Sequence, residues 1–240
     1  MNLIIKKDSD ELSREFAVWI IDYIEKKLQQ QHRFTIVLAG GSTPKKLYRL
    51  LASGEFKNKI DWGKLHFFWG DERYVPFTDD RNNAKMAFEN LLEHVPVRKE
   101  QIHTIQTDMK PEVSAIEYEK LLCRYFPSAN HSFDLVLLGM GDNAHTLSLF
   151  PGYDVVREKI NWVKAFYLEE QKMYRITLTS SVVNAASRVA FLISGADKAA
   201  ALYHVISGEY NPNLYPSQVI QPQNDELYWW VDEAAATRLE

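Results

Sequence analysis

Residues 133–150, FDLVLLGMGDNAHTLSLF, change abruptly from large apolar side chains to Gly, Asp, Asn and His. The apolar run predicts a buried strand, so His145 falls in a glycine-rich connection at the carboxyl end of that strand. An imidazole has an ordinary pKa of about 6.5 and can accept a proton near neutral pH. His145 is therefore a candidate general base, with a merely exposed loop histidine as the plain alternative.

Two adjacent glycines, Gly40 and Gly41, open a second candidate segment, AGGSTPKKLY at residues 39–48. Glycine adopts positive φ freely, and a helix that starts here leaves backbone N–H groups facing whatever lies in front of it. Ser42 is a candidate cap, with the proline two residues later as the first helical residue. Lys46 falls in the first turn, where the helix dipole disfavours a cation and a bound anion would reverse that cost. A capped turn with solvated lysines is the alternative.

Two more segments that follow predicted strands carry cations. In FFWGDERYVP, residues 67–76, the planar guanidinium of Arg73 suits a phosphate or carboxylate, and a surface salt bridge is the alternative. Asp71 and Glu72 are neighbours on an extended chain and point to opposite sides, which disfavours a shared metal ion. Lys198 lies near a predicted helix start and could add a point charge to an anion pocket, or simply be solvated.

Composition excludes several classes of function. The chain has 240 residues, 46% of them hydrophobic, and a formal net charge of −4, with no Lys/Arg run to attract nucleic acid. The single Cys123 allows no internal disulfide and no cysteine-cluster metal site, and the other six histidines form no His-x-x-x-His pair. The opening MNLIIKKDSD has too few apolar residues for a signal or membrane segment. We expect a cytoplasmic protein without a zinc or cysteine-cluster metal site.

The elements that must position these residues alternate between strand and helix. Short buried strands are predicted at 34–39, 65–69, 133–138 and 189–194, and further strands at 162–168, 175–179 and 227–231. Helices are predicted at 16–28, with Asp8 and Glu11 at its N-terminal cap, and at 44–53, 83–93, 112–125 and 197–207, while the proline-rich 211–223 is predicted to be loop.

This alternation predicts a single α/β domain over residues 1–240, a mostly parallel sheet with helices on both faces. In such open sheets ligands bind outside the carboxyl ends of the strands. The four polar segments all follow strands, so we expect them to meet there.

Five motifs in order resemble the 6-phosphogluconolactonases over about residues 33 to 236: AGGSTPKKLY, GDERYVP followed by Asn83, LLGMGDNAHTLSLFPG, RITLT with Asn184, and SGADKAAAL. The resemblance implies a Rossmann-like fold shared with glucosamine-6-phosphate deaminases and isomerases. It also implies hydrolysis of 6-phospho-D-glucono-1,5-lactone in the oxidative pentose phosphate pathway, without a metal or cofactor. His145 matches the proposed catalytic base. By position, the resemblance assigns substrate or phosphate contacts to Gly40, Gly41, Ser42, Asp71, Arg73, Arg175 and Lys198.

The decisive loop departs from the family pattern. The family has Pro-Asp-Gly-His where this chain has Asp142, Asn143, Ala144 and His145. Asn143 cannot supply the carboxylate that would support the imidazolium, so either Asp142 replaces it or the ring is oriented in another way. Ala144 restricts the backbone unless it keeps a negative φ. We expect activity to persist, with Asp142 or Asn143 hydrogen-bonded in the loop.

Two other functions stay open at this point. A phosphosugar deaminase or isomerase would resemble GHIAFNEPG after the histidine, and HTLSLFPG here lacks that carboxylate. A non-catalytic sugar-phosphate-binding homologue is the second alternative, since fold does not fix function. The expected partner is a small sugar phosphate, with no nucleic acid and no membrane, and the oligomeric state is not predicted.

Overall fold

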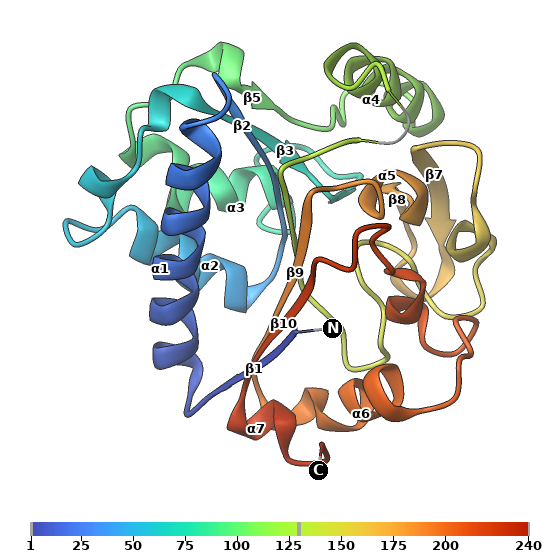
Figure 1. The fold of residues 1–240 in the computed structure, drawn as a ribbon. Helices are drawn as coiled ribbons and strands as arrows, with labels where there is room; N and C mark the ends of the chain where they lie inside the picture. The colour runs from blue at the N-terminus through green and yellow to red at the C-terminus, as the bar shows by residue number, and fades with distance from the viewer. Residues whose placement is uncertain (1, 129–130, 240) are drawn as a thin grey trace.

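A seven-stranded parallel sheet forms the centre of the protein in a computed structural model that describes residues 2–128 and 131–239 (Figure 1). Every pairing between its neighbouring strands is parallel. In spatial order the strands are β1 (Asn2–Lys6), β10 (Leu227–Asp232), β9 (Arg188–Ile193), β6 (Leu135–Leu138), β2 (Phe34–Leu38), β3 (Leu65–Trp69) and β5 (Ile102–His103).

The chain reverses its direction of travel across the sheet between β2 and β6. From β2 it proceeds through β3 to β5 at one edge, and it then returns to β6 on the other side of β2 and continues to β9 and β10. A crevice opens at such a switch point because the loops after the two strands leave in opposite directions. The loops after β2 and β6 are the ones that carry Gly40 and His145.

Helices cover both faces of this sheet, as the alternating pattern predicts. Figure 1 shows α1 (Ser9–Leu28), α2 (Ser42–Leu51) and α3 (Asn83–Asn90) on one face, and α4 (Pro111–Tyr125) and α5 (Ser180–Val183) on the other. The remaining helices, α6 (Ala199–Ser207) and α7 (Glu233–Ala236), follow the carboxyl ends of β9 and β10. No helix in the described parts of the chain is long and apolar enough to span a membrane.

A second, antiparallel sheet of three strands packs beside α4. Its order is β4 (Asp71–Arg73), β8 (Met173–Leu178) and β7 (Val163–Leu168). The strands expected at 162–168 and 175–179 are therefore present but outside the parallel sheet. The three-residue β4 was not expected from the sequence, and its pairing with β8 places Arg73 directly opposite Arg175.

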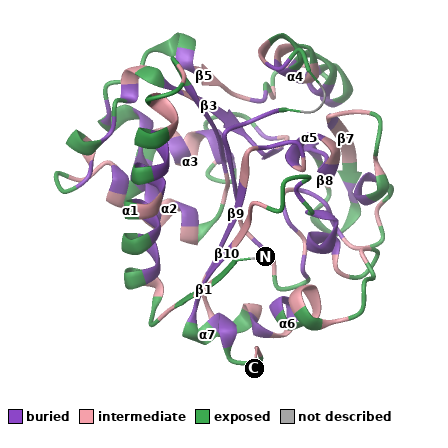
Figure 2. Ribbon diagram, viewed as in Figure 1, coloured by how far each residue is buried: buried purple, intermediate pink, exposed green. Residues whose placement is uncertain are grey.

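The central strands are apolar throughout because both of their faces are covered. All residues of β2 and β6 are buried, and Figure 2 shows this burial running through the middle of the sheet. The C-terminal segment packs on the same core, since Trp229 stacks on Phe191 with ring centroids 4.0 Å apart and Ala235 is fully buried.

The cap of α1 is as predicted: Asp8 accepts hydrogen bonds from the N–H groups of Asp10 and Glu11, and the Glu11 side chain accepts one from the N–H of Lys7. The expected cap of α2 is wrong. This helix begins at Ser42 itself, with Gly41 as N-cap at φ 105° and without a capping side chain. Only glycine reaches that φ readily, so the N-cap falls one residue earlier.

Other boundaries also differ from the prediction. The predicted helix 83–93 ends at Asn90, and 197–207 is a 3₁₀ turn, Ala196–Lys198, followed by α6. The expected loop 211–223 contains a 3₁₀ turn, Pro216–Val219. The strands β1 and β5 were not predicted, because both are short, partly exposed edge strands with no continuous buried run.

Candidate active site

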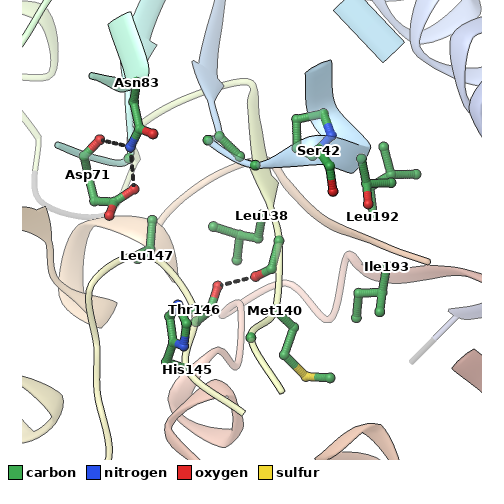
Figure 3. A pocket seen from close by; sticks show the side chains of 18 of the residues that line it. Ser42, Asp71, Asn83, Leu138, Met140, His145, Thr146, Leu147, Leu192 and Ile193 are labelled. Atoms are coloured by element: carbon green, nitrogen blue, oxygen red, sulfur yellow. Dashed lines mark hydrogen bonds between the residues drawn. The ribbon is translucent and has the colours of Figure 1, made fainter. Parts of the chain in front are cut away.

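A cavity of about 190 Å³ lies at the carboxyl ends of β2, β6 and β9, next to β4 and β8 (Figure 3). Two of the predicted residues, Asp142 and Asn143, do not line it. The predicted residues that do line it are Gly40, Gly41, Ser42, Asp71, Arg73, His145, Arg175 and Lys198. Four segments that are far apart in sequence therefore meet in one cavity, as expected for strand ends in a parallel sheet.

The loop after β2 and the first residues of α2 line this cavity with Gly40, Gly41 and Ser42. The first N–H groups of α2 have no partner within the helix, and the helix dipole makes its N-terminus a favourable place for an anion. Gly40 packs so closely on α3 that an added Cβ would lie 2.1 Å from Oδ1 of Asn83. Lys46 does not take part, because its ammonium contacts Asp10 at 2.5 Å and Ser9 Oγ at 2.8 Å. That ion pair relieves the unfavourable position of Lys46 in the first turn.

The His145 ring is held by Asn143. Its Nδ1 lies 2.5 Å from Asn143 Oδ1, which also accepts the backbone N–H of His145 at 3.2 Å. An amide oxygen can only accept hydrogen bonds, so Nδ1 carries the proton and Nε2 keeps its lone pair. Asp142 is exposed, and no hydrogen bond joins it to His145 in the described residues. Of the two orientations that the sequence allowed, the loop therefore adopts the one made by the amide.

Packing completes the placement of the imidazole. The ring stacks on Phe150, with centroids 4.2 Å apart, and lies so close to Gly141 that a Cβ there would be 2.1 Å from Nδ1. Thr146 donates a hydrogen bond to the carbonyl of Gly139 at 2.8 Å, which joins the two ends of the loop (Figure 3). The histidine is thus fixed by side chains and backbone on several sides.

The backbone of Ala144 is strained. Its φ is +63°, in the left-handed region that costs an alanine about 1–2 kcal/mol. Its carbonyl accepts two hydrogen bonds from Ser217, from the backbone N–H at 3.0 Å and from Oγ at 2.8 Å. The conformation persists because the Pro216–Val219 turn holds it in place.

The surroundings keep His145 neutral. Burial lowers the pKa of its imidazole from the ordinary 6.5 to about 4. The negative charge of Asp71 acts in the opposite direction and raises this pKa, while Arg175 and Lys198 lower it further. At neutral pH the imidazole is therefore uncharged, and its Nε2 can accept a proton.

Arg73 and Arg175 lie side by side as a cross-strand pair of β4 and β8. Arg175 is only 3% exposed, its Nη1 lies 3.4 Å from Asp71 Oδ2, and its Nη2 donates to Gln171 Oε1 at 2.7 Å. Arg73 donates to the carbonyl of Arg81 at 2.8 Å. The Nε atoms of both arginines are buried and have no hydrogen-bond partner among the described residues. Like charges directly opposite on a sheet repel, so a bound anion would stabilise this arrangement.

A buried polar network holds the cationic side of the cavity. Asp71 Oδ2 accepts a hydrogen bond from Ser148 Oγ at 2.5 Å, and the Asn83 amide donates to the Asp71 carbonyl at 2.9 Å (Figure 3). Glu72 points the other way, as predicted, and accepts the N–H groups of Arg73, Asn83 and Ala84 at 2.7–2.9 Å. Burial raises the pKa of Glu72 to about 7, against the effect of these hydrogen bonds.

Ser148 and Glu72 are the members of this network that sequence reasoning missed. The Asp71–Ser148 contact joins residues 77 positions apart, so no local pattern predicts it. Glu72 had one available signal, the helix that begins soon after the DER triplet, because a carboxylate favours the N-terminus of a helix.

Lys198 closes the cavity from the side of β9. It ends the 3₁₀ turn Ala196–Lys198, and its ammonium lies 3.0 Å from Asp197 Oδ2. Its side chain is 23% exposed, which leaves it accessible to a ligand in the cavity. Within the described residues, no group of three or more His, Cys, Asp or Glu side chains is arranged to hold a metal ion.

Comparisons with known proteins identify related chains. The family model described as glucosamine-6-phosphate isomerases/6-phosphogluconolactonase matches residues 7–229. The 6-phosphogluconolactonase of Nostoc sp. is 42% identical over 224 residues, covering 92% of this chain and 90% of that protein. The 6-phosphogluconolactonase of Synechocystis sp. is 38% identical over 226 residues, with 92% and 91% covered.

The fold matches solved structures as well. The 6-phosphogluconolactonase from Thermotoga maritima superposes with a TM-score of 0.83 at 26% identity, covering 97% of this chain and 99% of that one. The enzyme of the same name from Trypanosoma brucei gives a TM-score of 0.84 at 27% identity, with 100% and 98% covered. The chain therefore belongs to the glucosamine-6-phosphate isomerase/6-phosphogluconolactonase family.

Proposed function

We propose that this protein hydrolyses 6-phospho-D-glucono-1,5-lactone to 6-phosphogluconate. The main support for this proposal is that a neutral imidazole, two arginines, a lysine and a helix N-terminus line the same cavity. An ester with a distant phosphate needs both features, a base at the carbonyl and cations at the anionic tail. The Nostoc and Synechocystis relatives are named 6-phosphogluconolactonases, which supports the same reaction.

His145 acts as the general base in this reaction. Its Nε2 takes a proton from a water molecule while the water oxygen attacks C1, and the carbonyl becomes a tetrahedral oxyanion. The bond between C1 and the ring oxygen then breaks, and the imidazolium returns its proton to the departing ring oxygen. A positioned base contributes roughly 10²- to 10⁴-fold in rate. The hydrogen bond from Nδ1–H to Asn143 keeps the required lone pair on Nε2.

The phosphate is held by the cations and the helix N-terminus that line the same cavity. We assign it to Lys198, Arg73 and the N–H groups of Gly40, Gly41 and Ser42. A helix N-terminus and a guanidinium are both suited to phosphate oxygens, and the lysine adds a point charge. Asp71 and Ser148 hold Arg175 in the same wall, where its charge supports anion binding. No step of the proposed reaction passes through a metal or a cofactor.

The test is lactone hydrolysis by wild type and by His145→Ala, corrected for the spontaneous reaction. We expect kcat to fall by at least 10²-fold in the variant. His32→Ala is the matched control, because His32 is exposed and precedes β2 at the opposite end of the sheet. A His145→Ala variant that retains the wild-type rate would refute the role of the base.

Two further assays separate the alternative functions. Ammonia release from glucosamine 6-phosphate would indicate a deaminase, whereas the proposal expects none. Binding of 6-phosphogluconate without any acceleration of lactone opening by the wild type would indicate a binding protein that lacks catalysis.

A further inference from the structure

We propose that Asp232, at the end of β10, is a positioning residue for phosphate binding: its carboxylate holds the turn that carries Lys198 into the cavity. The inference rests on the proposed function, in which Lys198 contacts the phosphate of the substrate. Asp232 itself does not line the cavity, so its effect on the ligand passes through this turn.

The Asp232 carboxylate is almost fully buried, at 4% exposure, and joins two segments. Its Oδ1 accepts the N–H of Gly195 at 3.0 Å and the N–H of Ala235 at 2.8 Å. Its Oδ2 accepts a second hydrogen bond from the Gly195 N–H at 3.1 Å and another from the Ser194 hydroxyl. A buried carboxylate with this many donors is costly to disturb, because each donor it loses would be left unsatisfied.

The parallel register explains why the carboxylate reaches this turn. Val231 pairs with Ile193, so the next residue on each strand, Asp232 and Ser194, lie side by side where both strands end. Ile193 and Ser194 line the cavity. The hydrogen bonds of Asp232 therefore fix the backbone at the point where β9 leaves the sheet and passes the ligand site.

The connection from this point to Lys198 is short and constrained. Gly195 has a φ of +107°, and a Cβ there would lie 2.6 Å from Oδ1 of Asp197. The carbonyl of Gly195 accepts the N–H of Lys198 at 3.1 Å, which closes the 3₁₀ turn Ala196–Lys198. A change in the direction of Gly195 thus moves the start of the Lys198 side chain, since only one turn of backbone separates them.

A purely structural role would be to cap α7 through the Ala235 N–H, and it predicts a loss of stability alone. The positioning role predicts a change in phosphate affinity as well. Asp134 is a matched control: it is a buried aspartate of the same 4% exposure that accepts the Thr35 N–H at 2.8 Å and the Thr35 hydroxyl at 2.9 Å. It precedes β6 and so lies at the amino end of the sheet, away from the cavity.

The experiment is a double-mutant cycle on KM for the phospholactone, with kcat and thermal unfolding measured for each variant. We expect Asp232→Asn to raise KM about tenfold with kcat within about twofold of wild type, since small displacements of a binding group cost affinity. In a Lys198→Ala background the same substitution should raise KM less than about twofold, because the group it positions is gone. Asp134→Asn should lower the unfolding temperature and leave KM unchanged.

Inorganic phosphate gives an independent readout as a competitive inhibitor. Its inhibition constant should rise in Asp232→Asn by the same factor as KM. If Asp232→Asn does not fold, Asp232→Glu retains the charge on a side chain one methylene longer, and the same rise in KM is expected from the displaced turn.

The outcomes distinguish this inference from the proposed function. If Lys198→Ala raises KM while Asp232→Asn behaves like Asp134→Asn, the positioning role is overturned and the proposed function stands. If the effects of Asp232→Asn and Lys198→Ala on KM multiply in the double variant, the two residues act independently, and the positioning role is again overturned. If Lys198→Ala leaves KM unchanged, the phosphate role of Lys198 is wrong, and the positioning role falls with it.

Discussion

The exchange of Asn143 for aspartate should move the acid limb of the activity profile. In the wild type the pKa of His145 lies at about 4, mainly because the half-buried ring is desolvated. The base is thus unprotonated throughout the range above that value, and we expect kcat/KM to fall only as the pH approaches about 4. Asn143→Asp places a carboxylate at the position of the amide oxygen, 2.5 Å from Nδ1.

The magnitude follows from that contact. A net hydrogen bond between neutral groups contributes about 0.5–1.5 kcal/mol, and one to a charged group about 1.5–3 kcal/mol, so the added charge favours the imidazolium by about 1–1.5 kcal/mol. One pKa unit corresponds to about 1.36 kcal/mol, which predicts an upward shift of about one unit. The sign is positive because a carboxylate stabilises the protonated ring.

The assay is kcat/KM for the phospholactone as a function of pH from about 3 to 7, corrected for spontaneous opening at each pH. Asp142→Asn is the control, since it removes a charge from the same loop without touching the hydrogen bond to Nδ1. The Asp142 charge raises the pKa of His145, so its removal should move the limb only downward. A wild-type acid limb near the ordinary histidine value of about 6.5 would refute the effect of burial. An Asn143→Asp limb that stays in place or moves downward would refute the assigned contact between the amide and the ring.

Two further predictions concern stability. Ala144→Gly should raise the free energy of unfolding by about 0.5–1 kcal/mol in urea titrations, because relief of a φ of +63° exceeds the entropic cost of glycine; a loss of stability would contradict the assigned strain. Glu72 has a pKa raised from 4.5 to about 7 in the folded state, so its contribution is complete below pH 4.5 and is lost as the pH rises through 7. The unfolding free energy should therefore fall by about 3 kcal/mol over that window, and Glu72→Gln should flatten the slope; an unchanged slope would refute this assignment.

Much of the architecture could be predicted because the buried strands are local patterns. The runs at β2, β3, β6 and β9 are short and apolar, and glycines follow close behind them. Each run therefore predicts both the position of its strand and the polar loop after it. The edge strands β1 and β5 of the parallel sheet, and the short strand β4, were not predicted. Pairing with distant residues, rather than their own composition, makes them strands.

The residues of the site also divide into those that the sequence pattern predicts and those that it does not. The cationic and glycine residues could be grouped in advance because parallel strands bring their carboxyl ends together. The residue that orients His145 could not be predicted, because it depends on the conformation of the loop at Ala144. That conformation is held by Ser217, 73 residues away. The contacts of Ser148 with Asp71 and of Asp232 with Gly195 are equally long-range, so only the folded structure reveals them.

In the proposed complex, one cavity holds a sugar phosphate with its reacting carbon at His145 and its phosphate at the cationic residues. A crystal structure with bound 6-phosphogluconate tests it most directly. We predict the C1 carboxylate within hydrogen-bond reach of His145 Nε2, and the phosphate against Lys198, Arg73 and the N–H groups of Gly40, Gly41 and Ser42. A product bound outside this cavity, or one whose C1 lies away from His145, would contradict it.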